Sequence, residues 1–137
     1  MVPLQNKRQA PRILAVDDIE DNLSLLEAIL REEGYEVDTA TNGKSALAKI
    51  EASLPDLVLM DAMMPGMDGY EVIRRIRQNK KLPFIPVLLI TAYENANAAL
   101  GLDLGANDFI RKPIDYDELM ARIKASLRMK TMLNSPQ

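Results

Sequence analysis

Side chains that can bind a metal ion and a phosphate follow four short runs of this chain, three of them apolar. Asp17 and Asp18 follow residues 13–16, Asp61 follows 57–60, Thr91 follows 86–90, and Lys112 follows 108–111. If the four runs are parallel strands of one sheet, these groups project from the same carboxyl edge, where open α/β sheets bind their ligands. Carboxylate oxygens suit Mg²⁺, and hydroxyl and ammonium groups can donate hydrogen bonds to phosphoryl oxygens. The spacing therefore predicts a site for Mg²⁺ and a phosphoryl group.

The chain contains no cysteine and no histidine, which excludes several kinds of chemistry. Disulfides, zinc sites built on thiolates or imidazoles, cysteine nucleophiles and Ser-His-Asp triads all need one of these residues. A bound metal must be a hard cation held by oxygen, and a phosphohistidine must belong to another molecule. The net charge of −3 argues against a direct nucleic-acid partner, because such binding depends on cations that neutralise phosphates.

Length and composition indicate one globular domain. A chain of 137 residues can bury roughly two-thirds of the surface that it exposes when unfolded. No apolar stretch reaches the roughly 18 residues of a membrane span, and no long apolar run follows the basic residues near the N-terminus, as a secretory signal would require. We therefore expect a cytoplasmic protein without a membrane partner.

Five β-α units alternate along the sequence between two flexible tails, residues 1–11 and 131–137, which leaves 12–130 as the domain. The expected strands are residues 12–16, 35–40, 57–60, 86–90 and 108–111, each followed by a helix. Such units build a parallel sheet with helices on both faces, joined by right-handed crossovers. The sequence thus predicts an α/β, doubly wound, flavodoxin-like fold with strand order 2-1-3-4-5.

Periodicity assigns a buried face to the helices. The expected buried positions are Ile19, Leu23, Leu26 and Leu30 in the first helix, Ala46, Leu47 and Ile50 in the second, Val72, Ile73 and Ile76 in the third, and Leu119, Ile123 and Leu127 in the last. The third helix should turn Arg74, Arg75 and Arg77 outward. Asn42 and Asp115 are predicted N-caps.

The chain resembles the receiver domain of two-component response regulators over residues 12–130. The resemblance rests on motifs that occur in order, each at an expected strand end: Asp17-Asp18, Asp61 with the loop Met64-Pro65-Gly66-Met67-Asp68-Gly69, Thr91-Ala92, and Lys112-Pro113. It implies a chemotaxis-regulator-like fold and a phosphorelay signalling switch.

The chemistry of the residues and the resemblance together suggest roles at the site. Asp61 is the expected nucleophile and phosphorylation site, because an Asp carboxylate can attack phosphorus and form an aspartyl phosphate. Asp18 and Asp61 are expected to bind Mg²⁺ directly, and Asp17 through water. The resemblance adds the backbone carbonyl of Met63 as a further metal ligand.

Three other residues complete the expected site. Lys112 is the cation that stabilises the transferred group, and a cis bond to Pro113 would fix its direction. Thr91 either donates its hydroxyl to a phosphoryl oxygen or serves packing alone. Phe109 occupies the place of the family's rotating aromatic and can be both a core residue and a switch.

Two features depart from the family's pattern. Phe109 stands where many receivers have tyrosine, so any signal there must be carried by shape alone. Met63 and Tyr93, two residues after Asp61 and Thr91, are bulky where other receivers carry polar groups that assist water. The lifetime of the phosphorylated state is therefore open.

The resemblance implies a switch with weak autophosphatase activity rather than a metabolic enzyme. Its phosphodonor would be a histidine kinase or a histidine phosphotransfer protein. A downstream protein or output domain would bind the face formed by the fourth helix, fifth strand and fifth helix, and a phosphorylation-dependent dimer is compatible with this interpretation. Both a stand-alone regulator and a receiver cut from a larger protein fit the sequence.

Two rival classes place similar chemistry on similar folds. A haloacid-dehalogenase-like phosphatase also has an Asp nucleophile after a strand, but it needs a second Asp two residues later, where this chain has Met63. A flavin-binding electron carrier needs a Ser/Thr-rich phosphate loop after the first strand, which this sequence lacks. The segment Asn42–Ser45 is not a P-loop, since Asp38 stands where that motif requires glycine.

Overall fold

The computed structural model describes residues 10–92 and 95–134. Its elements, in chain order, are β1 (Arg12–Val16), α1 (Glu20–Glu32), β2 (Glu36–Ala40), α2 (Gly43–Ala52), β3 (Leu57–Asp61), α3 (Gly69–Gln78), β4 (Val87–Thr91), α4 (Asn95–Leu104), β5 (Asp108–Arg111) and α5 (Tyr116–Asn134). Each expected strand is present to within one residue at either end. Residues 1–9 of the expected N-terminal tail lie outside the described residues.

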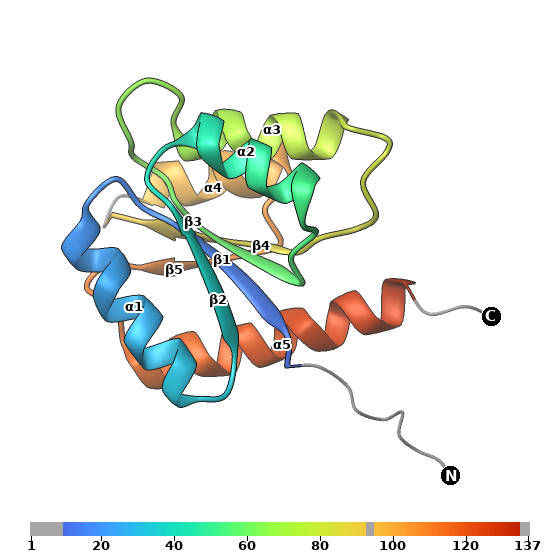
Figure 1. Ribbon diagram of the computed structural model, residues 1–137. Coiled ribbons are helices and arrows are strands. Elements are labelled where there is room, and N and C mark those ends of the chain that lie inside the picture. Colours follow the sequence, from blue (N-terminus) through green and yellow to red (C-terminus); the bar gives the residue numbers. More distant parts are fainter. Residues whose placement is uncertain (1–9, 93–94, 135–137) are drawn as a thin grey trace, which may run out of the picture.

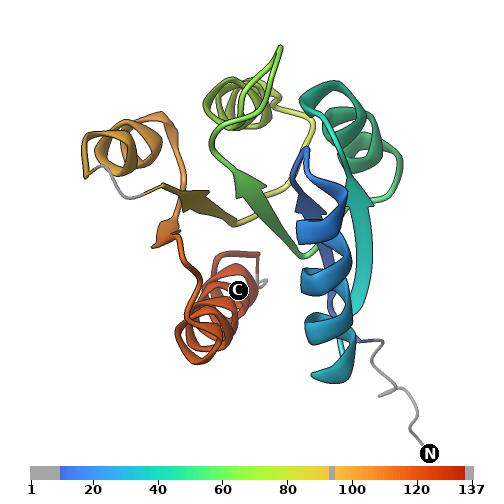
Figure 2. The ribbon, with the colours of Figure 1, turned by 90° about the vertical axis from the view of Figure 1, so that its left-hand side faces the viewer.

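The strands form one parallel sheet in the order β2-β1-β3-β4-β5, which confirms the predicted topology. Helices α2, α3 and α4 cover one face of the sheet, and α1 and α5 cover the other (Figure 1). Figure 2 shows the sheet lying between these two layers. The central strands β3 and β4 are buried along their whole length, as a parallel strand covered on both faces must be.

Successive residues of each strand point to opposite faces, so the sheet separates two apolar clusters. In β4, Val87 and Leu89 join the cluster under α2, α3 and α4, whereas Leu88 and Ile90 join the cluster under α1 and α5. All four side chains are buried. The alternation fixes which face each residue at the strand ends can reach.

Side-chain caps begin α2 and α5 as the sequence predicts, and a glycine follows α1. The side chain of Asn42 accepts a hydrogen bond from the Ser45 amide at the start of α2, and that of Asp115 accepts from the amides of Asp117 and Glu118 at the start of α5. After α1, Gly34 adopts a positive φ of 96°, a conformation that favours glycine.

Two expectations about single elements are wrong. Ile19 is the N-cap of α1 rather than part of its buried face, and it is 51% exposed. Its extended backbone, which precedes the first helical turn, takes its side chain off the helical stripe. Helix α5 continues to Asn134, four residues into the segment that the sequence assigned to a C-terminal tail.

Arg77 is a third correction, because its guanidinium turns into the protein instead of outward. It donates to the carbonyls of Gly105 (2.9 Å) and Ile85 (2.7 Å) and to Oδ1 of Asn107 (2.7 Å). Helical periodicity places Arg77 on the polar side of α3, but the segment before β4 and the turn before β5 supply acceptors there. Burial lowers the pKa of this guanidinium. Arg77 therefore joins α3 to the segments that precede β4 and β5.

Replacement of Arg77 by Met should lower the free energy of unfolding by about 2–4 kcal/mol. The variant keeps an apolar stem but removes three hydrogen bonds, and it leaves the carbonyl of the fully buried Ile85 without that donor. Urea denaturation followed by circular dichroism measures the change. Arg75→Met, at an exposed position of the same helix, is the matched control and should change stability by less than about 1 kcal/mol. Equal effects of the two substitutions would contradict the role of Arg77.

Candidate functional site

The predicted site residues lie at one edge of the sheet. Asp17 directly follows β1, Asp61 ends β3, Thr91 ends β4, and Lys112 directly follows β5. The parallel register sets these ends side by side, and the backbone amide of Lys112 donates to the carbonyl of Thr91 (2.8 Å). The carboxyl ends of four strands thus bring together groups that are far apart in the sequence.

Three carboxylates form the acidic part of the site. Asp17, Asp18 and Asp61 each offer one oxygen, and these oxygens lie within 4.8 Å of one another. Asp17 is held in place by hydrogen bonds from the amide of Ile19 (2.9 Å) and from the side chain of Asn22 (3.2 Å). Such a set of hard oxygen donors matches the coordination preferences of Mg²⁺.

Asp61 is deeply buried, with 3% of its surface exposed, as is Asp17 with 4%. Its pKa is raised from the usual 3.8 to about 6, chiefly by burial, with a smaller contribution from the negative charge of Asp17 and against the opposing effect of the positive charge of Lys112. At neutral pH the Asp61 carboxylate is therefore ionised in surroundings that disfavour its charge.

Lys112 reaches the acidic group from the end of β5. Its Nζ lies 3.3 Å from Oδ1 of Asp61, and its side chain remains more than one-third exposed. The peptide bond between Lys112 and Pro113 is cis, as predicted. A cation beside the carboxylate can also contact a group attached to that carboxylate.

Thr91 is 1% exposed, and its hydroxyl has no hydrogen-bond partner among the described residues. The hydroxyl of Tyr70 is in the same condition. Sequence alone does not distinguish Tyr70 from the other apolar residues of α3, where it lies in the first turn. The one signal in the sequence is the hydroxyl itself, since a tyrosine at a buried helix position normally needs a hydrogen-bond partner.

The remaining predicted residues lie around this group. Phe109 is half-buried against the cluster under α2, α3 and α4, and the guanidinium of Arg111 lies 5.4 Å from the centre of its ring. Met63 is 59% exposed. Tyr93 lies outside the described residues.

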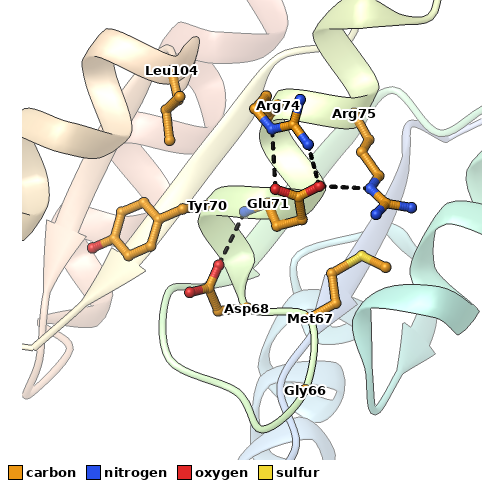
Figure 3. Close-up of a pocket in the computed structure, with 8 residues that line it drawn as sticks. All are labelled: Gly66, Met67, Asp68, Tyr70, Glu71, Arg74, Arg75 and Leu104. Atoms are coloured by element: carbon orange, nitrogen blue, oxygen red, sulfur yellow. Dashed lines mark hydrogen bonds and ion pairs between the residues drawn. The ribbon is translucent and has the colours of Figure 1, made fainter.

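A hollow beside α3 is lined by residues of that helix, of the loop before it and by Leu104 of α4 (Figure 3). Glu71 occupies its wall and pairs with both Arg74 and Arg75, at 2.5 and 2.7 Å. These ion pairs hold the pKa of Glu71 near 2, well below its usual range. The two arginines are thus already paired within their own helix.

Comparison with known proteins agrees with this geometry. The family model of the response regulator receiver domain matches residues 13–124. Response regulator PleD from Caulobacter vibrioides is 48% identical over 124 residues, which make up 90% of this chain and 27% of that protein. The alkaline phosphatase synthesis transcriptional regulatory protein PhoP from Bacillus subtilis is 45% identical over 118 residues, or 85% of this chain and 48% of that protein.

A solved structure shows the same likeness in three dimensions. The signal receiver domain of a signal transduction histidine kinase from Syntrophus aciditrophicus superposes with a TM-score of 0.83 at 33% identity, covering 93% of this chain and 98% of that one. The chain therefore belongs to the response regulator receiver domains. It spans about a quarter to a half of the length of the two curated relatives. In the described part of the chain, no helix combines the length and apolar character needed to cross a membrane.

Replacement of Asp61 by Asn should stabilise the metal-free protein at pH 7 by about 1–3 kcal/mol. The pKa of Asp61 is higher in the folded protein than in the unfolded chain, so the wild type loses stability as the pH rises from 3.8 to about 6, and the full cost of the buried charge remains above that range. The advantage of Asn should be complete above pH 7 and should vanish below about pH 3, where the wild-type carboxyl is protonated in both states.

Urea denaturation in a chelator, at several pH values, measures this difference. Asp103→Asn, on the exposed side of α4, is the control and should show no such pH-dependent gain. A destabilised Asp61→Asn protein at pH 7 would contradict the unfavourable burial of this charge.

Proposed function

We propose that this receiver domain accepts a phosphoryl group on Asp61 from a phosphohistidine of a partner kinase or phosphotransfer protein, with Mg²⁺ as cofactor. The observation that carries the proposal is the group formed by a buried carboxylate, two neighbouring carboxylates and a lysine at one edge of the sheet. Because these 137 residues contain no histidine, the donor phosphohistidine lies outside them.

In the proposed reaction, a carboxylate oxygen of Asp61 forms a bond to phosphorus while the bond from phosphorus to the donor nitrogen breaks. The donor imidazole leaves and takes up a proton from solvent. Phosphoryl transfer needs little covalent help from the protein beyond alignment and charge stabilisation. The position of Asp61 at the end of a fully buried strand supplies the alignment.

The three carboxylates fit a divalent cation. Asp18 and Asp61 would hold Mg²⁺ directly, Asp17 would act through water, and the carbonyl of Met63 would complete the protein ligands. When bound, the ion would neutralise charge on the carboxylates and on the phosphoryl oxygens. Lys112 would pair with one phosphoryl oxygen, and the hydroxyl of Thr91 would donate to another.

The proposed output is a conformational change near Thr91 and Phe109, recognised by a partner or an attached output domain at the face formed by α4, β5 and α5. Some basic residues on that side are already engaged within the chain. Arg122 pairs with Asp108 (2.9 Å), and Lys130 pairs with Asp56 (3.0 Å). These ion pairs favour a protein partner over nucleic acid.

A haloacid-dehalogenase-like phosphatase remains the rival function, and the residue at 63 separates the two classes. That class needs a carboxylate as acid and base two residues after the nucleophile, and Met63 offers none. We therefore expect a phosphorylated protein that accumulates, rather than rapid turnover of phosphate esters.

Incubation with acetyl phosphate and Mg²⁺ should label the wild-type protein at one site. Asp61→Asn should abolish the label, because an amide cannot take its place as nucleophile. Phosphate-affinity gels and intact mass spectrometry measure the label, and Asp103→Asn is the control that should stay labelled. Label that persists in Asp61→Asn, needs no Mg²⁺ or resists hydroxylamine would refute an aspartyl phosphate at this position.

Lys112→Ala should leave the fold intact and weaken the response to phosphorylation. The lysine side chain is partly exposed and adds little to the core, but it links Asp61 to the segment before Pro113. Amide shifts upon addition of beryllium fluoride and Mg²⁺, measured by NMR, should shrink in this variant. Lys124→Ala, at an exposed position of α5, should respond as the wild type does. A full response of Lys112→Ala would exclude the coupling role.

A further inference from the structure

Two buried hydroxyls face the same part of the core, and neither has a hydrogen-bond partner among the described residues. One belongs to Thr91 at the end of β4, the other to Tyr70 in α3, and the two residues are 1% and 8% exposed. Buried polar groups without partners are uncommon in native proteins, because their loss of water is not compensated. Two of them together call for an explanation.

The strand alternation places Thr91 on the same side of the sheet as Tyr70. Val87 and Leu89 point toward α2, α3 and α4, so Thr91, two residues further along β4, points there as well. The ring of Tyr70 belongs to that same cluster. Figure 3 shows the Tyr70 side chain extending from α3 with its hydroxyl at the end remote from Arg74 and Arg75.

The chemical environment of Tyr70 agrees with this placement. Burial raises the pKa of its hydroxyl, a polar interaction with the Thr91 side chain lowers it, and the negative charges of Asp68 and Asp61 raise it. The Tyr70 hydroxyl therefore lies close to the Thr91 side chain, although the two hydroxyls do not have the geometry of a hydrogen bond.

The ring of Tyr70 also contacts α4. A Cβ atom added at Gly101 would lie 3.4 Å from Cε1 of Tyr70, on the side of the ring that leads to the hydroxyl. Glycine at this position lets α4 pack closely over Tyr70 and Leu89. Any movement of the Tyr70 ring must therefore be accommodated by α4.

We propose that Tyr70 is a positioning residue whose hydroxyl donates a hydrogen bond to Oγ1 of Thr91 when Thr91 donates its own hydrogen to a phosphoryl oxygen on Asp61. This inference rests on the proposed function. A threonine hydroxyl has one hydrogen to donate and two lone pairs that accept, so it can join Tyr70 to the phosphoryl group in a chain. Each hydrogen bond in such a chain polarises and strengthens the next.

The proposed series of hydrogen bonds changes the interpretation of Phe109. Phe109 lacks a hydroxyl, and the sequence therefore suggested a switch that acts by shape alone. Tyr70 supplies a hydroxyl to Thr91 from α3, on the same face of the sheet as Phe109. The signal then reaches α4 through the Tyr70 ring and Gly101.

The contact itself is tested by NMR on protein labelled with ¹³C at the tyrosine Cζ, which responds to hydrogen bonding of the hydroxyl. Beryllium fluoride with Mg²⁺ should shift the Tyr70 signal in the wild type. In Thr91→Val, which keeps the shape of Thr91 but has no hydroxyl, that shift should be lost. The signal of Tyr35, at the other end of the sheet, should not move in either protein.

The coupling is tested by the amide shifts of residues 100–104 in α4 under the same conditions. Tyr70→Phe should reduce these shifts by about half or more, and Tyr35→Phe should not change them. In the double variant Tyr70→Phe/Thr91→Val, the α4 amide shifts should be reduced no more than in Thr91→Val alone, because both substitutions break the same series of hydrogen bonds.

Two results would overturn the inference and leave the proposed function standing. One is that the α4 amide shifts in Tyr70→Phe are as large as in the wild type. The other is that the Tyr70 signal does not move in a wild-type protein whose Asp61 and Lys112 amides do respond. Additive losses in the double variant would overturn it as well. A wild-type protein that neither becomes labelled nor responds to beryllium fluoride would refute the proposed function, and the inference with it.

Discussion

The burial of the Asp61 carboxylate is the constraint on which the rest of the site depends. Asp61 closes a strand with every residue buried, and Asp17 brings a second negative charge to the same place. Lys112 offsets only part of this cost, so the pKa of Asp61 stays above its usual value. The rigid sheet holds together charges that repel one another, and a bound cation would relieve that repulsion.

Close backbone packing keeps Asp61 where it is. The amide of Gly69, the first residue of α3, donates to the carbonyl of Ala62 (3.0 Å). A Cβ atom at Gly69 would collide with the backbone carbonyl of Asp61, so only glycine lets the helix begin so near the end of β3. The loop after Asp61 therefore returns to the strand from which it left, and α3 starts beside the site it supports.

The sequence predicted the strands, their order and the shared edge of the site, because apolar runs and polar strand ends are local patterns. It failed where a residue's environment comes from distant segments. Arg77 follows the polar stripe of α3, yet its acceptors belong to residues 85, 105 and 107. Tyr70 fits the apolar stripe, yet what distinguishes it is the unpaired hydroxyl of Thr91 on another element. Periodicity describes a single helix and carries no information about which groups the other elements bring to it.

Two of the three hydrogen bonds of Arg77 also define how α4 can move. They fasten the turn at Gly105 and Asn107 to α3, so the C-terminal end of α4 is anchored to its neighbour. A helix fixed at one end can tilt about that end. Helix α4 has ten residues and is therefore roughly 15 Å long. A tilt of about 10° would move its N-terminal end by roughly 2.5 Å. Gly101 lies near the anchored C-terminal end, where a small displacement of the packed Tyr70 ring is enough to produce that tilt.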